Sequence, residues 1–174
     1  MSPLVVADRE AMHRLGERLA DMLAPGDLVV LSGSLGAGKT TLTQGIGRGL
    51  HVRGEVTSPT FVIARVHPST TGGPALVHVD AYRLSSLDEV DDLDLDASLE
   101  DSVTVVEWGE GKVEGLAEDR LLVHVERPTG GSGPAHDPAD DGDPAEPRTV
   151  TVTGVGPRWA GLDLDALLAP AVRP

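Results

Sequence analysis

The chain has 174 residues and no cysteine, so neither a disulfide nor a thiolate metal site can form within it. Its formal net charge of -14 at pH 7 argues against a protein that grips nucleic acid through a broad surface of its own, because the phosphates would be repelled. There is neither a signal peptide nor an apolar run of about 18 residues, which predicts a cytoplasmic protein that does not contact the membrane. The length predicts a single domain over residues 1–174.

The N-terminal part of the chain predicts a helix and then a buried strand. Asp8 stands at an N-cap position, and Met12, Leu15 and Leu19 follow it at helical spacing. A Pro-Gly-Asp turn at 25–27 leads into "LVVLSG" at 28–33, a short apolar run typical of a buried strand. A second helix, which contains several glycines, is predicted over residues 39–50.

Further strands are predicted along the rest of the chain. Two strands at 61–67 and 75–82 flank a polar loop and are compatible with a hairpin. "SVTVVEW" at 102–108 predicts another buried strand, and the alternating segments at 120–127 and 148–156 predict antiparallel neighbours.

Three segments outside the sheet also carry predictions. Residues 86–101 mix leucine and valine with many carboxylates, which indicates a partly helical segment. Residues 128–147 are rich in Pro, Gly and Asp and predict a disordered loop inserted between two strands, because they cannot bury enough apolar surface. A closing helix is predicted near residues 162–169.

The segment "GSLGAGKT" at 33–40 has the spacing of a phosphate-binding P-loop. It follows a predicted buried strand and opens a predicted helix, so backbone amides and a helix N-terminus can converge on phosphate oxygens. Lys39 is predicted to reach the β- and γ-phosphates, Thr40 to ligate Mg²⁺, and Thr41 to contact the α-phosphate. The predicted nucleotide-binding residues are Gly33, Ser34, Leu35, Gly36, Ala37, Gly38, Lys39, Thr40 and Thr41.

Two further strands end in a carboxylate, Asp80 after "LVHV" and Glu107 after "VTVV". Beside a P-loop, such groups are candidates to hold Mg²⁺ or to take part in catalysis together with Lys39, although an acidic residue at a strand end is common. His78 shares a strand face with Asp80, and a lone histidine is more often structural than catalytic.

A loop and a tryptophan complete the candidate site. Thr57, Ser58 and Thr60 surround Pro59 in "TSPTF", either as a switch-like loop that senses the γ-phosphate or as an ordinary entry to a strand. Trp108 directly follows Glu107 in a chain with only four aromatic residues. Trp108 is either a packing residue or a stacking or docking surface that couples the site to a partner.

Taken in order, "GSLGAGKTT", "TSPTF", "HVDAYRL" and "VVEW" resemble the TsaE family over residues 8–127. The resemblance implies an α/β P-loop NTPase-type mixed sheet with a parallel centre, antiparallel edge strands and flanking helices. It further implies an ATPase of tRNA threonylcarbamoyladenosine biosynthesis that uses ATP and Mg²⁺ and acts with the subunits TsaB and TsaD, which handle the tRNA. In this resemblance Asp80 matches the Walker B carboxylate, and Glu107 and Trp108 match an acidic and aromatic pair near the nucleotide.

Two other functions are compatible with a P-loop. A small-molecule kinase would share the phosphate and Mg²⁺ ligands, but it normally has an arginine-bearing lid, and no arginine-rich segment of that kind is evident. A nucleotide-dependent switch would bind a partner in one nucleotide state and hydrolyse little.

Overall fold

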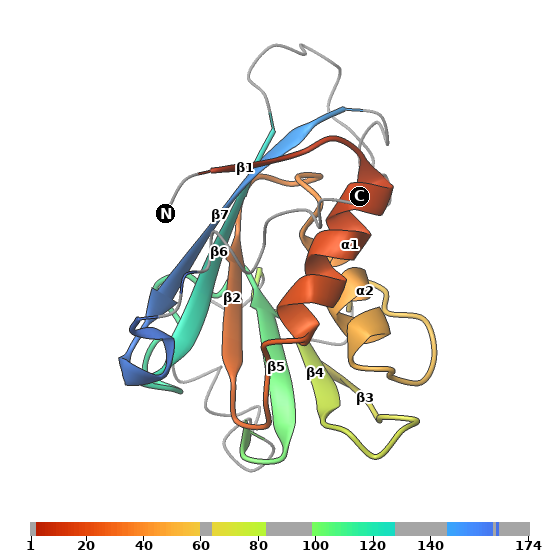
Figure 1. The fold of residues 1–174 in the computed structure, drawn as a ribbon, viewed down its shortest axis with the longest axis vertical. Coiled ribbons are helices and arrows are strands. Elements are labelled where there is room, and N and C mark those ends of the chain that lie inside the picture. Colours follow the sequence, from red (N-terminus) through yellow and green to blue (C-terminus); the bar gives the residue numbers. More distant parts are fainter. Residues whose placement is uncertain (1–2, 60–63, 83–98, 128–145, 162, 164–174) are drawn as a thin grey trace.

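The computed structural model describes residues 3–59, 64–82, 99–127, 146–161 and 163. Within these ranges, seven strands form one sheet in the order β1-β7-β6-β2-β5-β4-β3 (Figure 1). The strands are β1 (Leu4–Val6), β2 (Leu28–Ser32), β3 (Ala64–His67), β4 (Ala75–Asp80), β5 (Ser102–Glu107), β6 (Arg120–Glu126) and β7 (Arg148–Val155).

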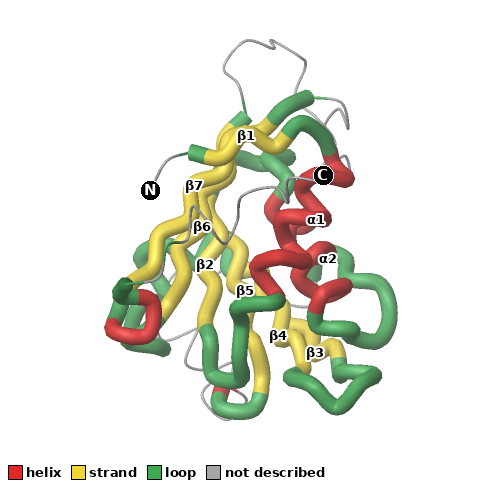
Figure 2. Tube along the Cα trace, in the orientation of Figure 1, coloured by secondary structure: helices red, strands yellow, loops and turns green. Residues whose placement is uncertain are grey.

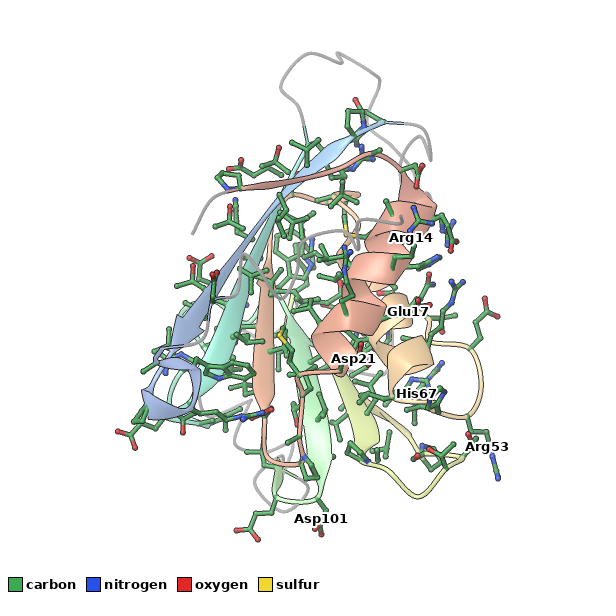
Figure 3. All side chains as sticks on the ribbon, viewed as in Figure 1. Arg14, Glu17, Asp21, Arg53, His67 and Asp101 are labelled. Atoms are coloured by element: carbon green, nitrogen blue, oxygen red, sulfur yellow. The ribbon has the colours of Figure 1, made fainter. Side chains whose placement is uncertain are left out.

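The centre of the sheet is parallel and its edges are antiparallel, which confirms the predicted fold class. Strand β2 pairs in parallel with both β5 and β6, and β5 pairs in parallel with β4. The predicted antiparallel pairs also form, β3 with β4 and β6 with β7. As a result, the carboxyl ends of four parallel strands meet along one edge of the sheet, and Asp101 (labelled in Figure 3) lies at the opposite, amino end of β5.

Two helices, α1 (Arg9–Ala20) and α2 (Lys39–Gly49), lie side by side on one face of the sheet (Figure 2). Asp8 caps α1 as predicted, because its carboxylate accepts a 2.7 Å hydrogen bond from the Ala11 amide. The apolar side of α1 packs on the sheet with α2, and the core cluster contains Met12, Leu15, Leu19, Leu42, Ile46 and alternate residues of the parallel strands. This packing holds α2 directly beyond the end of β2.

The other face of the sheet buries a second, smaller apolar cluster. It contains Leu28 and Val30 of β2 with Val79 of β4, and Val113 from the segment after β5 packs on them. The segment after β5 therefore returns over this face instead of leaving the sheet.

Two short elements were not predicted, and three predicted segments lie mostly outside the described residues. Strand β1, which pairs with β7, and a 3-10 helix η1 (Pro157–Trp159) are too short to show a hydrophobic period. Of the helix predicted over 86–101, only residues 99–101 are described, and the closing helix near 162–169 is represented by residue 163 alone. The insertion predicted at 128–147 is described only at residues 146 and 147.

Neither helix in the described part of the chain is long and apolar enough to cross a membrane.

A buried ion pair attaches η1 to the start of β2. Asp27 is 4 % exposed, and both of its carboxylate oxygens accept from Arg158, whose Nη2 lies 2.6 Å from Oδ2. The Arg158 guanidinium also stacks on Trp159 and donates to the Met22 carbonyl. The hydrogen bond to Asp27, together with the charges of Asp27 and Asp119, raises the pKa of Arg158.

Replacing Arg158 by alanine is expected to lower the free energy of unfolding by about 2–3 kcal/mol, because the Asp27 carboxylate stays buried without its cation. This is below the roughly 3–5 kcal/mol that breaking a fully buried pair costs, since Arg158 is partly exposed. Urea denaturation measures the change. Arg14→Ala is the control, since Arg14 faces solvent on α1 (Figure 3) and only approaches Glu10 at 3.8 Å. Equal losses in the two variants would contradict a structural role for the Asp27 pair.

Candidate functional site: a P-loop with a buried carboxylate

The predicted P-loop spans the gap between β2 and α2, and its last two residues, Lys39 and Thr40, begin α2. Gly33 follows β2 with φ 137°, and a Cβ there would collide with the Val125 carbonyl of β6, so only glycine fits this turn. Among the other predicted nucleotide-binding residues, Ala37 and Thr41 are buried, whereas Leu35 is 59 % exposed at the tip of the loop. The helix N-terminus that follows the loop is a favourable place for phosphate.

Lys39 lies inside the loop and not in solvent. It is 4 % exposed, and its Nζ donates to the carbonyl oxygens of Gly33 and Ser34, both at 2.9 Å. Its Nζ also lies 3.9 Å from the centre of the Trp108 ring. Burial lowers the pKa of Lys39, and the nearby carboxylates of Glu107 and Asp80 oppose that shift. The loop therefore holds a preorganised ammonium group.

Glu107 is the carboxylate that contacts the P-loop. It ends β5, the strand next to β2, and it is 3 % exposed. Its Oε1 accepts from the Thr40 hydroxyl at 2.9 Å and from His78 Nε2 at 2.8 Å. A P-loop hydroxyl paired with a carboxylate at an adjacent strand end is an oxygen donor set that suits Mg²⁺.

Asp80 lies beside Glu107, one strand farther from the P-loop. Its Oδ1 accepts from the Tyr82 amide at 2.9 Å, and its Oδ2 lies 3.5 Å from the Ser58 hydroxyl. Thr57, in the same loop as Ser58, accepts from Arg65 at 3.1 Å. The structure thus brings Asp80 and part of the predicted switch-like loop together, while Thr60 lies outside the described residues.

In the part of the chain that the structure describes, no three His, Cys, Asp or Glu side chains gather closely enough to hold a metal ion by themselves. Mg²⁺ is commonly held by one or two carboxylates together with substrate phosphates, so such a cage is not required here.

Trp108 has an unusual backbone. Its φ is 62°, a left-handed value that is uncommon for an aromatic residue, and its amide donates to the Leu31 carbonyl of β2 at 3.0 Å. The ring is partly buried between Lys39 and Tyr82, and it meets the Tyr82 ring edge to face at 5.0 Å. Trp108 therefore connects the P-loop lysine to Tyr82, whose side chain is 63 % exposed.

A cavity of about 590 Å³ adjoins this tryptophan. Its walls come from the end of β2, the P-loop and the segments after β4 and β5, together with β6. The lining residues are Ser32, Gly33, Ser34, Tyr82, Trp108, Glu110, Lys112 and His124.

Sequence reasoning did not identify Glu110, Lys112 or His124 as site residues. Only Lys112 has a sequence feature that sets it apart, because it is the only lysine besides Lys39. Its Nζ donates to the Ala81 carbonyl at 2.7 Å, so it joins the segment after β5 to the end of β4. His124 bonds to Ser32 at 2.8 Å, a contact that follows from the pairing of β6 with β2 and from no local pattern.

The fold and the loop together define a P-loop NTPase-type α/β protein. A model of the family described as "Threonylcarbamoyl adenosine biosynthesis protein TsaE" matches residues 6–132. The chain therefore belongs to the TsaE family, whose role lies in the biosynthesis of threonylcarbamoyladenosine in tRNA.

Named relatives agree with this assignment. The chain is 65 % identical to the tRNA threonylcarbamoyladenosine biosynthesis protein TsaE of Streptomyces coelicolor, over 90 % of this chain and 99 % of the relative. It is 35 % identical to the Bacillus subtilis protein of the same name, over 86 % of this chain and 84 % of the relative. The crystal structure of Bacillus subtilis YdiB superposes with a TM-score of 0.64 at 29 % identity, covering 91 % of this chain and 88 % of that one.

Proposed function

We propose that this protein binds Mg-ATP in its P-loop and hydrolyses it as the nucleotide-driven component of tRNA threonylcarbamoyladenosine formation. The observation that carries the proposal is the contact between Thr40 and Glu107 at 2.9 Å, directly beside the buried ammonium of Lys39. Cation, hydroxyl and carboxylate are the three groups that a Mg-nucleotide site requires of the protein.

Each group has a separate task in this proposal. Lys39 and the loop amides bind the β- and γ-phosphates, and Thr40 with Glu107 and Asp80 holds Mg²⁺ or its water. When bound there, the metal ion would neutralise charge that develops on the phosphates. Glu107 also orients the attacking water, and Thr57, Ser58 and Thr60 respond to the γ-phosphate.

We further propose that the protein acts in the cytoplasm with TsaB and TsaD and reaches tRNA only through them. Its charge of -14 supports this, because direct binding to a polyanion would be opposed. The test is ATP hydrolysis by the purified protein with and without Mg²⁺ and with and without these partners. The absence of ATP hydrolysis under every condition would refute the proposal.

A nucleotide-dependent switch with little turnover is a second candidate. It is favoured by Trp108, whose ring joins Lys39 to the exposed Tyr82. Under this alternative, partner binding would depend on which nucleotide is bound, and hydrolysis would stay slow even with partners present.

Trp108→Ala is expected to fold and to bind ATP but to lose most of its activity in the assembled system. The reason is that the loop lysine keeps its two carbonyl contacts while the connection to Tyr82 is lost. Reconstituted tRNA modification, with ATP affinity measured alongside, checks this expectation. Trp108→Phe keeps a ring in place and is the matched control. Normal modification by the alanine variant would return Trp108 to a packing role.

A further inference from the structure

Behind the P-loop lies a buried polar network of three side chains. His78, in β4, is 0 % exposed, and its Nε2 lies 2.8 Å from Glu107 Oε1. The same oxygen accepts from Thr40 at 2.9 Å. Histidine, carboxylate and P-loop hydroxyl thus form one continuous chain from β4 through the end of β5 to the start of α2.

The donors in this network can be assigned from its acceptors. An ionised Glu107 can only accept, so His78 Nε2 must carry a hydrogen. His78 Nδ1 is buried and has no hydrogen-bond partner among the described residues. The tautomer with its hydrogen on Nε2 leaves only a lone pair at Nδ1. His78 Nε2 is therefore the donor in its contact with Glu107.

This arrangement fixes the orientation of the carboxylate. Within the described residues both hydrogen bonds reach Oε1, so Oε2 is the oxygen that remains for a metal ion or its water. A donor behind a ligating carboxylate typically changes metal affinity about 10–100-fold when it is removed.

We propose that His78 is a positioning residue that holds Glu107 in the orientation in which its carboxylate receives the magnesium ion, or the magnesium-bound water, of Mg-nucleotide. This inference rests on the proposed function, because it assumes that Mg-nucleotide binds at the P-loop. A burial role alone does not explain the residue, since a leucine at this position would fill the core without an unpaired nitrogen.

The experiment measures the affinity of the whole protein for a fluorescent ATP analogue in a Mg²⁺ titration and again in EDTA. His78→Leu is expected to weaken Mg²⁺-dependent binding about 10-fold and to leave the affinity in EDTA unchanged. His78→Gln, whose amide nitrogen takes the place of Nε2, is expected to stay close to wild type. His78→Asn, whose amide nitrogen takes the place of Nδ1 and cannot reach Glu107, is expected to behave like the leucine variant.

His67→Leu is the matched control. His67 is also a buried histidine, 4 % exposed, and lies on the neighbouring strand β3 (Figure 3). In the described structure it makes no hydrogen bond to Glu107. Its Mg²⁺ dependence is expected to match wild type. Wild-type Mg²⁺ dependence in His78→Leu would overturn the proposal, as would an equal loss in His67→Leu. If His78→Leu does not fold, the contrast between the glutamine and asparagine variants decides, and equal affinities in those two would overturn it. A wild-type protein without Mg²⁺-dependent binding would instead refute the proposed function.

Discussion

Lys39→Ala is expected to lower the affinity for Mg-ATP at least about 100-fold, equivalent to about 2.7 kcal/mol, and to abolish turnover. The variant removes the buried ammonium of the loop, and a charge-assisted contact to phosphate cannot be replaced by water in the same geometry. The fold is expected to persist, because the loop remains attached to β2 and α2 and the lost contacts are to two carbonyl groups. Calorimetric titration with ATP and a thermal melt of the variant measure both effects.

The chain supplies a matched control for this variant. Lys112 is the only other lysine and also lines the cavity beside the P-loop, but its Nζ is bonded to the Ala81 carbonyl. Lys112→Ala removes the same charge from the same neighbourhood and is expected to retain nucleotide affinity within a few fold. An equal loss in both variants would mean that general electrostatic attraction, and not the loop geometry, binds the nucleotide.

Glu107→Gln is expected to reduce the rate of ATP hydrolysis about 100–1,000-fold and to weaken Mg²⁺-dependent binding by a smaller factor. Glutamine preserves the size of the side chain but removes the negative charge that a metal ion or an attacking water requires. Asp80→Asn is expected to weaken Mg²⁺-dependent binding or hydrolysis, since Asp80 lies beside Glu107 and is proposed to help hold the metal ion or its water. Single-turnover hydrolysis in the presence of partners separates the two effects. Wild-type rates in both variants would mean that neither carboxylate takes part in metal binding or catalysis.

The fold could be predicted from local patterns wherever one segment carries its own signal. The P-loop spacing, the Asp8 cap and the alternating segments at 120–127 and 148–156 each identify an element without knowledge of the rest of the chain. The resemblance to one family supplied the parallel centre. Strand β1 carried no such signal, since three residues cannot display a period.

The P-loop and the two strand-end carboxylates can be proposed from the sequence, whereas their contacts and the cavity residues Glu110, Lys112 and His124 cannot. Both strand-end carboxylates were found, yet the sequence could not say which lies nearer the P-loop. Strand β5 lies between β4 and β2, and this order is what places Glu107, and not Asp80, against Thr40. From the sequence, His78 is more often structural because it is a lone histidine, and no local pattern reveals its partner Glu107, 29 residues away in another strand. The pairing of Asp27 with Arg158 is separated by 131 residues and is equally invisible to spacing arguments.

The position of β2 in the sheet affects how the protein is made. Both of its partners come late in the chain, since residues 28–31 pair with 104–107 and residues 28–32 pair with 120–124. The β3–β4 and β6–β7 pairs join strands that are consecutive in the chain. Strand β2 can pair only when distant segments are available, and long-range pairing of this kind slows folding. On the ribosome, the segment that carries the P-loop emerges early and stays without its neighbours until residue 124 has left the exit tunnel. Truncated nascent chains would therefore carry the loop without the geometry that a nucleotide requires.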